Sequence, residues 1–514
     1  MKMKLMKIIS LLIHVAILSA MLSLFTACGI IIINDKGRDE RIKIRETAAE
    51  SDETAVSETG PALTAAETAR PYKPVVIPDN KKIARKYLNA VETRDFNGVG
   101  ILIATTDVPT FAPQDTSNLV YNARIERNIA VEEKFNTKII AVPTEYRELY
   151  DNTYNAVYAG EYYTDILGLP SVGIGQFYAK GLIMNLNSLP FADYTAPYFD
   201  AKAMSQLSAG YGVYGAVGEL NKNIDYYFGV FFNKKLIKEL GLESPYDLVY
   251  ENKWTLDKFR EMTRAVSAVY GVYGHGHGAK ITPDNYIDMF YLASGENFMD
   301  TGVNIYPSPE YLNTRAENLV TKLRRILKTD GTLFDGKSED ALKTFYDGKL
   351  LFYVDLVNVM QWFTDMDDDW GLAPLPKLDV SQSYYYTYPL NSIPVISVPL
   401  TTSNIENIGL FLQAANAASY GYINDVYYSI LQRDIVRDSD TLNMLDYITG
   451  INGKGRLAVD FALTLGNGYS FVVDGTYNAV RLAVNQNYSL KSLFDNYSAT
   501  LASRLKQYFP MDIG

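Results

Sequence analysis

Two histidines and a run of aspartates are the residue groups best suited to hold a metal ion. His275 and His277 alternate with glycines in residues 274–278, and two imidazoles could bind a transition metal with help from elsewhere. No carboxylate lies beside them in the sequence, and the glycines predict a flexible loop. Asp365 and residues 367–369 could hold a hard cation, but a solvated acidic turn is the commoner outcome. We therefore expect no metal site.

Catalytic signatures are sparse. The sequence has no nucleophile elbow and no HExxH motif, and no GxGxxG follows a predicted strand. We expect no phosphate-binding loop, and nothing favours a Ser-His-Asp arrangement. A pair of carboxylates for glycoside hydrolysis would be invisible, because their separation depends on the fold. The sequence predicts a protein that is not an enzyme and needs no cofactor.

Polar and aromatic residues near the ends of predicted strands are the candidate ligand contacts, because open α/β sheets bind ligands beyond the carboxyl ends of their strands. They are Asp107, Ser171, Asp225, Tyr226, Tyr227, Asp355, Asn358, Trp362 and Tyr385. Aromatic faces can cover the C–H surface of a polyol, while polar side chains meet its hydroxyls. The aspartates at 107 and 355 could instead cap helices, and the tyrosines could lie on the surface or between lobes. Trp254 precedes a predicted helix and is expected in the core.

Predicted strands and helices alternate along the first part of the body, which indicates βαβ units and a parallel sheet. The strands are expected at 99–105, 138–142 and 165–169, and the helices at 118–135 and 145–159. Further strands are expected at 227–232 and 349–354, with helices at 81–91, 234–240 and after Thr255. The last hundred residues are predicted to be mostly helical. The fold class is therefore α/β.

The N-terminus has the features of a secretion signal. Three lysines precede an apolar run from Ile8, and small residues precede Cys28, the only cysteine of the chain. We expect residues 1–27 to be a signal peptide and Cys28 to be the lipidated residue of a bacterial lipoprotein. Phe25 stands where a lipobox usually has leucine. Residues 8–33 could alternatively remain as an uncleaved membrane helix, or the chain could be released.

The segment after the cysteine changes in composition. Glu, Thr, Ala and Ser dominate residues 34–78, and large apolar residues are sparse. Residues 28–80 are therefore expected to form a disordered acidic tether, since they cannot bury a core. The folded body is expected over 95–514, a length sufficient for two lobes. With no second cysteine, this body must be stable without disulfides.

Composition restricts the possible partners. Hydrophobic residues make up 47% of the 514 residues and charged residues 21%, which describes an ordinary globular chain. The formal net charge is −11, and the leader contributes three lysines and no acid, so the remainder is more acidic still. This balance excludes nucleic acid and anionic membrane surfaces as partners.

Several segments in order resemble extracellular solute-binding proteins of family 1, the maltose-binding-protein-like receptors of ABC importers. They are residues 132–139, 185–190, 231–249, 253–258, 345–352, 370–377 and 437–446. The resemblance covers nearly all of the body, and the segment 231–249 with 253–258 is its most specific part. Many relatives carry an acidic loop that resembles a calcium site after the Trp-Thr helix. Here that place holds residues 269–278, so calcium is not expected.

The resemblance implies a two-lobed periplasmic-binding-protein-like fold of type II, with the ligand in a cleft between the lobes. The first lobe is expected to comprise residues 95–225 and 390–435, and the second 226–389 and 436–514. The implied function is to bind a carbohydrate, most simply an oligosaccharide, and to deliver it to ABC permease transmembrane subunits. A monomer held by its lipid on the extracytoplasmic face of the cell membrane is expected.

Three alternatives remain open at this point. The chain could be an exported glycoside hydrolase, which would place two carboxylates about 5–10 Å apart in the cleft. It could be a surface adhesion or sensory module, which would expose an apolar patch. It could also bind a peptide or another small solute in the same cleft.

Overall fold

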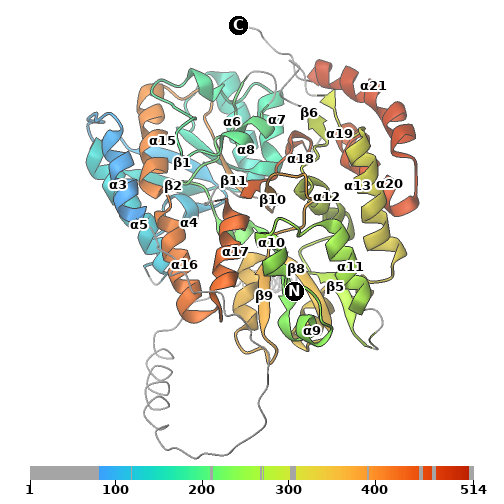
Figure 1. Cartoon of the computed structure of the whole chain (residues 1–514). Coiled ribbons are helices and arrows are strands. Elements are labelled where there is room, and N and C mark those ends of the chain that lie inside the picture. The colour runs from blue at the N-terminus through green and yellow to red at the C-terminus, as the bar shows by residue number, and fades with distance from the viewer. Residues whose placement is uncertain are drawn as a thin grey trace, which may run out of the picture. The chain divides into compact units, whose positions relative to one another are not determined.

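The computed structural model describes residues 80–508, apart from gaps at 117, 209–211, 267–268, 270, 301–307, 391–392, 451–454 and 466–469. Figure 1 shows the arrangement of its helices and strands. The predicted signal peptide, Cys28 and nearly all of the predicted tether lie outside these residues. None of the described helices is long and apolar enough to cross a membrane.

A four-stranded sheet forms the first lobe, in the order β11-β3-β1-β2. The strands are β1 (Ile101–Thr105), β2 (Ile139–Pro143), β3 (Ile166–Pro170) and β11 (Pro394–Ser397). β1 pairs in parallel with β2 and β3, whereas β11 returns from much later in the chain and pairs antiparallel with β3. Every residue of β3 and β11 is buried, as expected for strands covered on both faces.

Helices link and cover the strands of the first lobe. They are α3 (Asn80–Ala90), α4 (Val108–Phe111), α5 (Leu119–Phe135), α6 (Tyr146–Ala159), α7 (Ile174–Ala179), α8 (Ala201–Gln206) and α15 (Ile405–Ser419), with short turns η1 (Ser171–Gly173) and η2 (Leu186–Ser188). α5 and α6 are the crossovers between parallel strands. α15 packs against α3, and its residues from Asn407 onward are buried, as in a core helix (Figure 1).

A second four-stranded sheet forms the other lobe, in the order β5-β8-β4-β9. Its strands are β4 (Phe228–Asn233), β5 (Tyr273–His277), β8 (Leu350–Leu356) and β9 (Trp370–Ala373). β5 and β8 are parallel, and β4 runs antiparallel to both β8 and β9. Two short pairs complete the strands: β10 (Tyr385–Thr387) with β12 (Gly455–Leu457), and β6 (Met299–Asp300) with β7 (Ser308–Pro309).

Helices make up most of the rest of the second lobe. They are α9 (Lys234–Glu239), α10 (Pro245–Tyr250), α11 (Leu256–Val266), α12 (Pro283–Ala293), α13 (Thr314–Arg324), α14 (Ser338–Tyr346), α17 (Ser439–Thr449), α19 (Ser470–Gly475), α20 (Tyr477–Gln486) and α21 (Leu490–Tyr508), with turns η4 (Arg325–Thr329) and η5 (Val357–Phe363). Helix starts follow local chemistry: the Asn233 side chain accepts from Leu236 N, and Thr282 precedes Pro283 at the start of α12. α13, α20 and α21 pack together beside α19 (Figure 1).

The chain passes between the lobes through segments that pair with each other. Turn η3 (Ile224–Tyr226) leads into β4, and Tyr227 bridges antiparallel to Pro389. Phe228 N donates to Tyr388 O at 3.2 Å, and Leu390 N donates to Tyr226 O at 2.7 Å. A third passage runs from α15 through α16 (Tyr422–Asp434) to α17. These backbone bonds define where the two lobes join.

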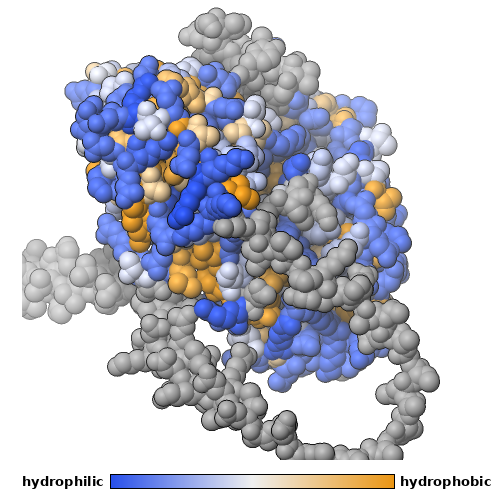
Figure 2. All heavy atoms as spheres, turned by 60° about the vertical axis from the view of Figure 1, so that its left-hand side comes forward, coloured by the Kyte–Doolittle hydropathy of each residue, from blue (hydrophilic) through white to orange (hydrophobic). Residues whose placement is uncertain are grey.

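Large apolar side chains fill the interior, whereas the face of the molecule in Figure 2 is mostly hydrophilic with small hydrophobic patches. Trp254 is fully buried, and its Nε1 donates to Pro374 O at 2.7 Å. It packs edge-on against Phe259 and Phe352. The prediction that Trp254 is a core residue is confirmed.

One predicted loop is wrong. Residues 273–277, expected to be a flexible glycine-rich loop, form β5, and both histidines are buried. The glycines allow close packing: a Cβ on Gly274 would lie 2.8 Å from Thr263 Cβ. His275 Nδ1 lies 3.0 Å from Tyr286 Oη, and burial lowers the pKa of His275 to about 4, so the ring is neutral.

Candidate functional site

Two small cavities lie between the lobes. The first has a volume of about 30 Å³, room for one or two waters. Its walls are Lys202, Gln206, Leu292, Gly295, Asn297, Tyr386, Ala458 and Val459. Lys202 and Gln206 belong to α8 of the first lobe, and Leu292 to Tyr386 belong to the second. The cavity is therefore shared by both lobes.

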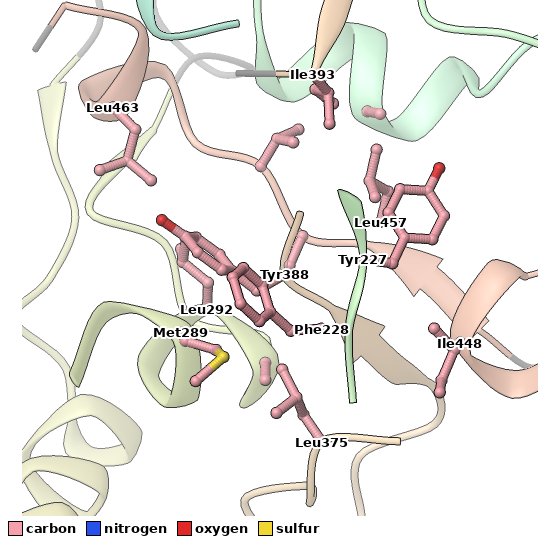
Figure 3. Packing of buried hydrophobic residues seen from close by; sticks show 14 of the residues in the cluster. Tyr227, Phe228, Met289, Leu292, Leu375, Tyr388, Ile393, Ile448, Leu457 and Leu463 are labelled. Atoms are coloured by element: carbon pink, nitrogen blue, oxygen red, sulfur yellow. The ribbon is translucent and has the colours of Figure 1, made fainter. Parts of the chain in front are cut away.

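The second cavity lies beside the crossing segments and has about 10 Å³. It is lined by Ser171, Val172, Leu207, Tyr388, Pro389, Ala458, Val459, Asp460, Leu463 and Thr464. Ser171 begins η1, directly after the carboxyl end of β3. Tyr388 stacks on Phe228, with ring centroids 5.9 Å apart, and Figure 3 shows Leu292 and Met289 beside this pair. Ala458 and Val459 line both cavities, so the two spaces adjoin the same segment.

Uncharged polar groups and one aromatic ring face the first cavity. Gln206 Nε2 donates to Asn297 Oδ1 at 3.2 Å, which is a direct bond between the lobes. Gln206 Oε1 is buried, and no hydrogen-bond partner for it is found among the described residues. The Tyr386 ring packs over Gly295, where a Cβ would approach its Cε2 to 3.1 Å. An unpaired buried carbonyl costs free energy, so a ligand hydroxyl or a water would complete this site.

The segment 455–465 contacts elements of both lobes. β12 pairs with β10, and the short helix α18 (Phe461–Thr464) follows. α18 packs against η1 and α7 of the first lobe. Asp460 is 2% exposed, and its Oδ2 accepts from Phe298 N at 2.8 Å and from Met299 N at 3.3 Å. Its Oδ1 accepts from Ala462 N at 2.8 Å. Burial raises the pKa of Asp460 to about 7, although these three N–H bonds oppose the shift.

Ser171 is the one predicted contact residue that lines either cavity. Tyr227 lies in the crossing segment, where it bridges to Pro389 of the second cavity's lining. Val357 N donates to the Tyr227 carbonyl oxygen at 2.8 Å. Figure 3 shows the Tyr227 ring on the opposite side of the chain from Tyr388. Ser171 therefore remains a candidate ligand contact. Tyr227 instead contributes backbone hydrogen bonds to the segment that joins the lobes.

Three other predicted contacts gather around a buried arginine instead. Arg124 of α5 is influenced by the charges of Asp107 and Asp225 and by Tyr226. Asp107 caps α4: Thr110 N donates to its Oδ1 at 3.2 Å, and Thr110 Oγ1 donates to its Oδ2 at 2.8 Å. Burial raises the pKa of Asp225, which accepts from Tyr427 Oη at 3.0 Å. This cluster lies outside both cavities, and the capping alternative accounts for Asp107.

The remaining predicted contacts lie within the second lobe. Asp355 is buried at the end of β8, where Tyr353 Oη donates to its Oδ2 at 2.6 Å and Leu356 N donates to its Oδ1. Burial raises the pKa of this carboxyl group. Asn358 and Trp362 lie on η5, and the Trp362 side chain is 50% exposed. Tyr385 is buried in β10.

The chemistry of the Tyr385 surroundings is that of a core. Lys377 Nζ lies 4.4 Å from the Tyr385 ring centroid, and Tyr447 packs edge-on at 5.6 Å. Lys377 also donates to Asn252 Oδ1 and to Gln382 O. Burial lowers the pKa of Lys377 to about 8. Gln206, Asn297 and Asp460 were missed as candidates, because only the fold brings α8, the 295–299 turn and segment 455–465 together.

Metal and phosphate sites are not supported among the described residues. No group of three or more His, Cys, Asp or Glu side chains in that part of the chain could hold a metal. Residues 331–338 match the phosphate-loop pattern GxxxxGKS, which corrects the expectation that the sequence has no such motif. Helical residues, not a strand, precede them, and Phe334 N is already bonded to His275 O. Such a loop needs a strand before it and free amides, so the match is accidental.

The two α/β lobes, joined by paired crossing segments around a shared interior, define a two-lobed binding-protein fold. No protein-family model and no curated protein match the chain. Solved structures do match it. One is a cyclic α-maltosyl-1,6-maltose binding protein from Arthrobacter globiformis, with 13% identity, a TM-score of 0.53 and coverage of 80% of this chain and 100% of that one.

A second solved structure is a family 1 extracellular solute-binding protein from Bifidobacterium longum subsp. infantis. It has 12% identity and a TM-score of 0.51, and the match covers 79% of this chain and 99% of that one. The chain therefore has the fold of family 1 extracellular solute-binding proteins. The predicted fold class, α/β with two lobes, is confirmed.

Proposed function

We propose that the chain binds a carbohydrate between its lobes and is the substrate-binding component of an ABC importer. The observation that carries this proposal is the lining of the interlobe cavities. Neutral hydrogen-bonding groups from both lobes, Gln206, Asn297 and Ser171, stand beside the tyrosines at 386 and 388. Amides and hydroxyls match sugar hydroxyls, and tyrosine faces match the C–H surface of a sugar ring. The fold supports the same function.

Binding accounts for the site better than catalysis. Asp460 is the one carboxylate among the described residues that line the two cavities, and its oxygens accept three backbone N–H bonds. A glycosidase needs two carboxylates flanking the scissile bond. Lys202 is the one cationic group in this lining, which does not suit a charged peptide ligand. The hydrolase and peptide alternatives therefore have less support.

The leader supports the location that we propose for this function. Lipidation of Cys28 would hold the chain on the extracytoplasmic face of the cell membrane, and the acidic segment to residue 80 would serve as a tether. Confinement near the membrane raises the effective concentration at the permease. A monomer docking on permease transmembrane subunits fits this arrangement.

A thermal-shift screen of the purified full chain tests the proposal. A ligand at one hundred times its dissociation constant stabilises the folded state by about 2.7 kcal/mol, which raises the melting temperature by a few degrees. We expect at least one maltose-type or galactose-type oligosaccharide to give this shift, whereas amino acids, dipeptides and polyamines leave the midpoint unchanged. A shift with peptides and with no sugar would contradict the proposal.

A further inference from the structure

The chain leaves the second lobe at α18 and returns to it. Before α18, β12 pairs with β10, and Asp460 binds the amides of Phe298 and Met299, all in the second lobe. After α18, α19 to α21 pack with one another, and α20 and α21 pack on α13 and on β7. Between these attachments, α18 lies against η1 and α7 of the first lobe. The α18 segment therefore belongs to the second lobe by its attachments but packs on the first lobe.

The seat on the first lobe is shaped for α18. A Cβ on Gly175 of α7 would lie 2.9 Å from Leu465 Cγ and 2.9 Å from Thr464 Oγ1, so any larger residue here would force these side chains to move. Leu465 is fully buried, and Phe461 meets the Tyr178 ring edge-on at 6.5 Å. Leu463 of α18 lines the second cavity together with Ser171 and Tyr388, and Figure 3 shows its side chain on a helical turn. Packing this close leaves space for one water at most.

We propose that residues 458–465 act as an internal latch, which lies between the lobes and holds them together. The latch competes with the ligand for the space beside Ser171 and Tyr388, and this second half of the inference rests on the proposed function. Asp460 fixes the start of α18 to the second lobe, and the Leu465 side chain seats its end on the first. A sugar larger than the present cavities can enter only as α18 withdraws.

The Asp460 carboxyl group makes the latch sensitive to its surroundings. The titratable groups that interact with it directly are Glu310 and Tyr291, and those that act through one of these two are Glu296, Asp300, Tyr311 and Lys202. The negative charge of Glu310 disfavours ionisation of Asp460. Lys202 of α8 attracts the Glu310 carboxylate and offsets part of this negative charge. Ionised Asp460 is therefore less stable in the buried, seated position than neutral Asp460.

A wedge at position 175 tests the latch without any ligand. The leucine of Gly175→Leu would clash with Leu465 when α18 packs on the first lobe, and the clash is relieved when α18 moves away. The interlobe distance is measured by electron spin resonance between labels at Asn155→Cys on α6 and Val380→Cys in the second lobe, in the full chain with Cys28→Ser. We expect the parent to show one short distance and the wedge variant to show a dominant longer one.

The matched control is the size swap, Gly175→Leu with Leu465→Ala, which removes the blocking side chain and should restore the short distance. A wedge variant that keeps the parent distance, or a parent that already shows the longer one, overturns the proposal. Circular dichroism and melting of each variant establish that it is folded. If the wedge variant fails to fold, Leu465→Ala alone replaces it and should also shift the population toward the longer distance.

A reversible cross-link provides the second measurement. Gly175→Cys and Leu465→Cys lie close enough for a disulfide, because a Cβ at position 175 would lie 2.9 Å from Leu465 Cγ. We expect the oxidised chain to lose binding of the sugar found by the thermal-shift screen and to regain it on reduction. Equal binding by both forms overturns the competition. A chain that binds no sugar in either form counts against the proposed function, while the distance measurement still decides the latch.

Discussion

At the scale of single residues, the interlobe site is built from groups that are poor at chemistry and good at recognition. Gln206 donates to Asn297 across the lobe boundary and keeps its own carbonyl oxygen without a described partner. A hydroxyl of a bound sugar can donate to that oxygen, which satisfies it. A buried acceptor of this kind gives specificity, because a ligand without a hydroxyl group at that position leaves the acceptor unpaired.

Replacing Gln206 by leucine should weaken sugar binding. The variant removes a buried acceptor and the bond to Asn297, which together contribute about 1–3 kcal/mol. We expect the dissociation constant to rise about 5- to 100-fold in isothermal titration. Gln486→Leu, on the exposed end of α20, is the matched control and should leave binding unchanged. Equal affinities for parent and Gln206→Leu would remove this residue from the site.

Asp460 should make the seating of α18 depend on pH. Its pKa is raised from 3.8 to about 7 in the folded chain, so the seated state prefers the neutral carboxyl group. The stabilisation is complete below pH ~4, decreases as the pH rises toward ~7 and changes no further above that. Hydrogen exchange at Phe298 and Met299 should therefore become faster relative to Asp460→Asn across this window. An identical pH response in the two proteins would contradict this assignment.

At the scale of elements, the strands and the crossover helices were predictable from the sequence. Apolar runs such as residues 99–105 and 165–169 identify buried strands, and β1 and β3 lie there. β5 was missed, because its glycines suggest a loop when viewed locally, and only its burial between α11 and β8 makes them strand residues. The segment 455–465 gave no local signal either, since its role comes from packing on a distant lobe.

The cap of α4 distinguishes the two roles considered for Asp107. Both carboxylate oxygens bind Thr110, so Asp107→Ala should lower the free energy of unfolding by about 1 kcal/mol. Sugar affinity should stay within twofold, because the residue lies outside both cavities. Urea unfolding and isothermal titration measure these two quantities. A large loss of affinity in a variant of nearly normal stability would return Asp107 to the ligand site.

The candidate site could be predicted only in part. Reasoning from strand ends found Ser171. It also selected Tyr385, three residues before Tyr388, and Tyr227, which bridges to Pro389 next to Tyr388. It also selected Asp355, which the fold uses inside the second lobe. Strand ends are visible in a sequence, whereas the meeting of α8 with the 295–299 turn depends on how two lobes face each other.

At the scale of the whole molecule, the two lobes together with the leader and tether that we propose would suit a receptor that works beside a membrane. Residues of both lobes line the two cavities, so a ligand bound there would stabilise the contact between the lobes. Residues 1–79 carry no part of the described fold. The anchor and the binding that we propose can therefore be tested separately.

Replacing Cys28 by serine tests the anchor that we propose. Without the thiol no lipid can be attached, and the protein should move from the membrane fraction to the extracytoplasmic fluid. Sugar binding should be unchanged, because the residue is remote in sequence from the described lobes. Immunoblots of the two fractions measure the effect, with the unmodified chain as control. Continued retention in the membrane would favour an uncleaved helix over residues 8–33.

The central claim is that a carbohydrate binds between the lobes, and hydrogen exchange with and without the sugar selected by the thermal-shift screen tests it most directly. The account predicts slower exchange on both sides of the interlobe space at once, in α8 with η1 and in the 292–299 and 385–390 segments. Protection confined to the outer surface of one lobe, or conversion of the sugar into a product during the measurement, would contradict it.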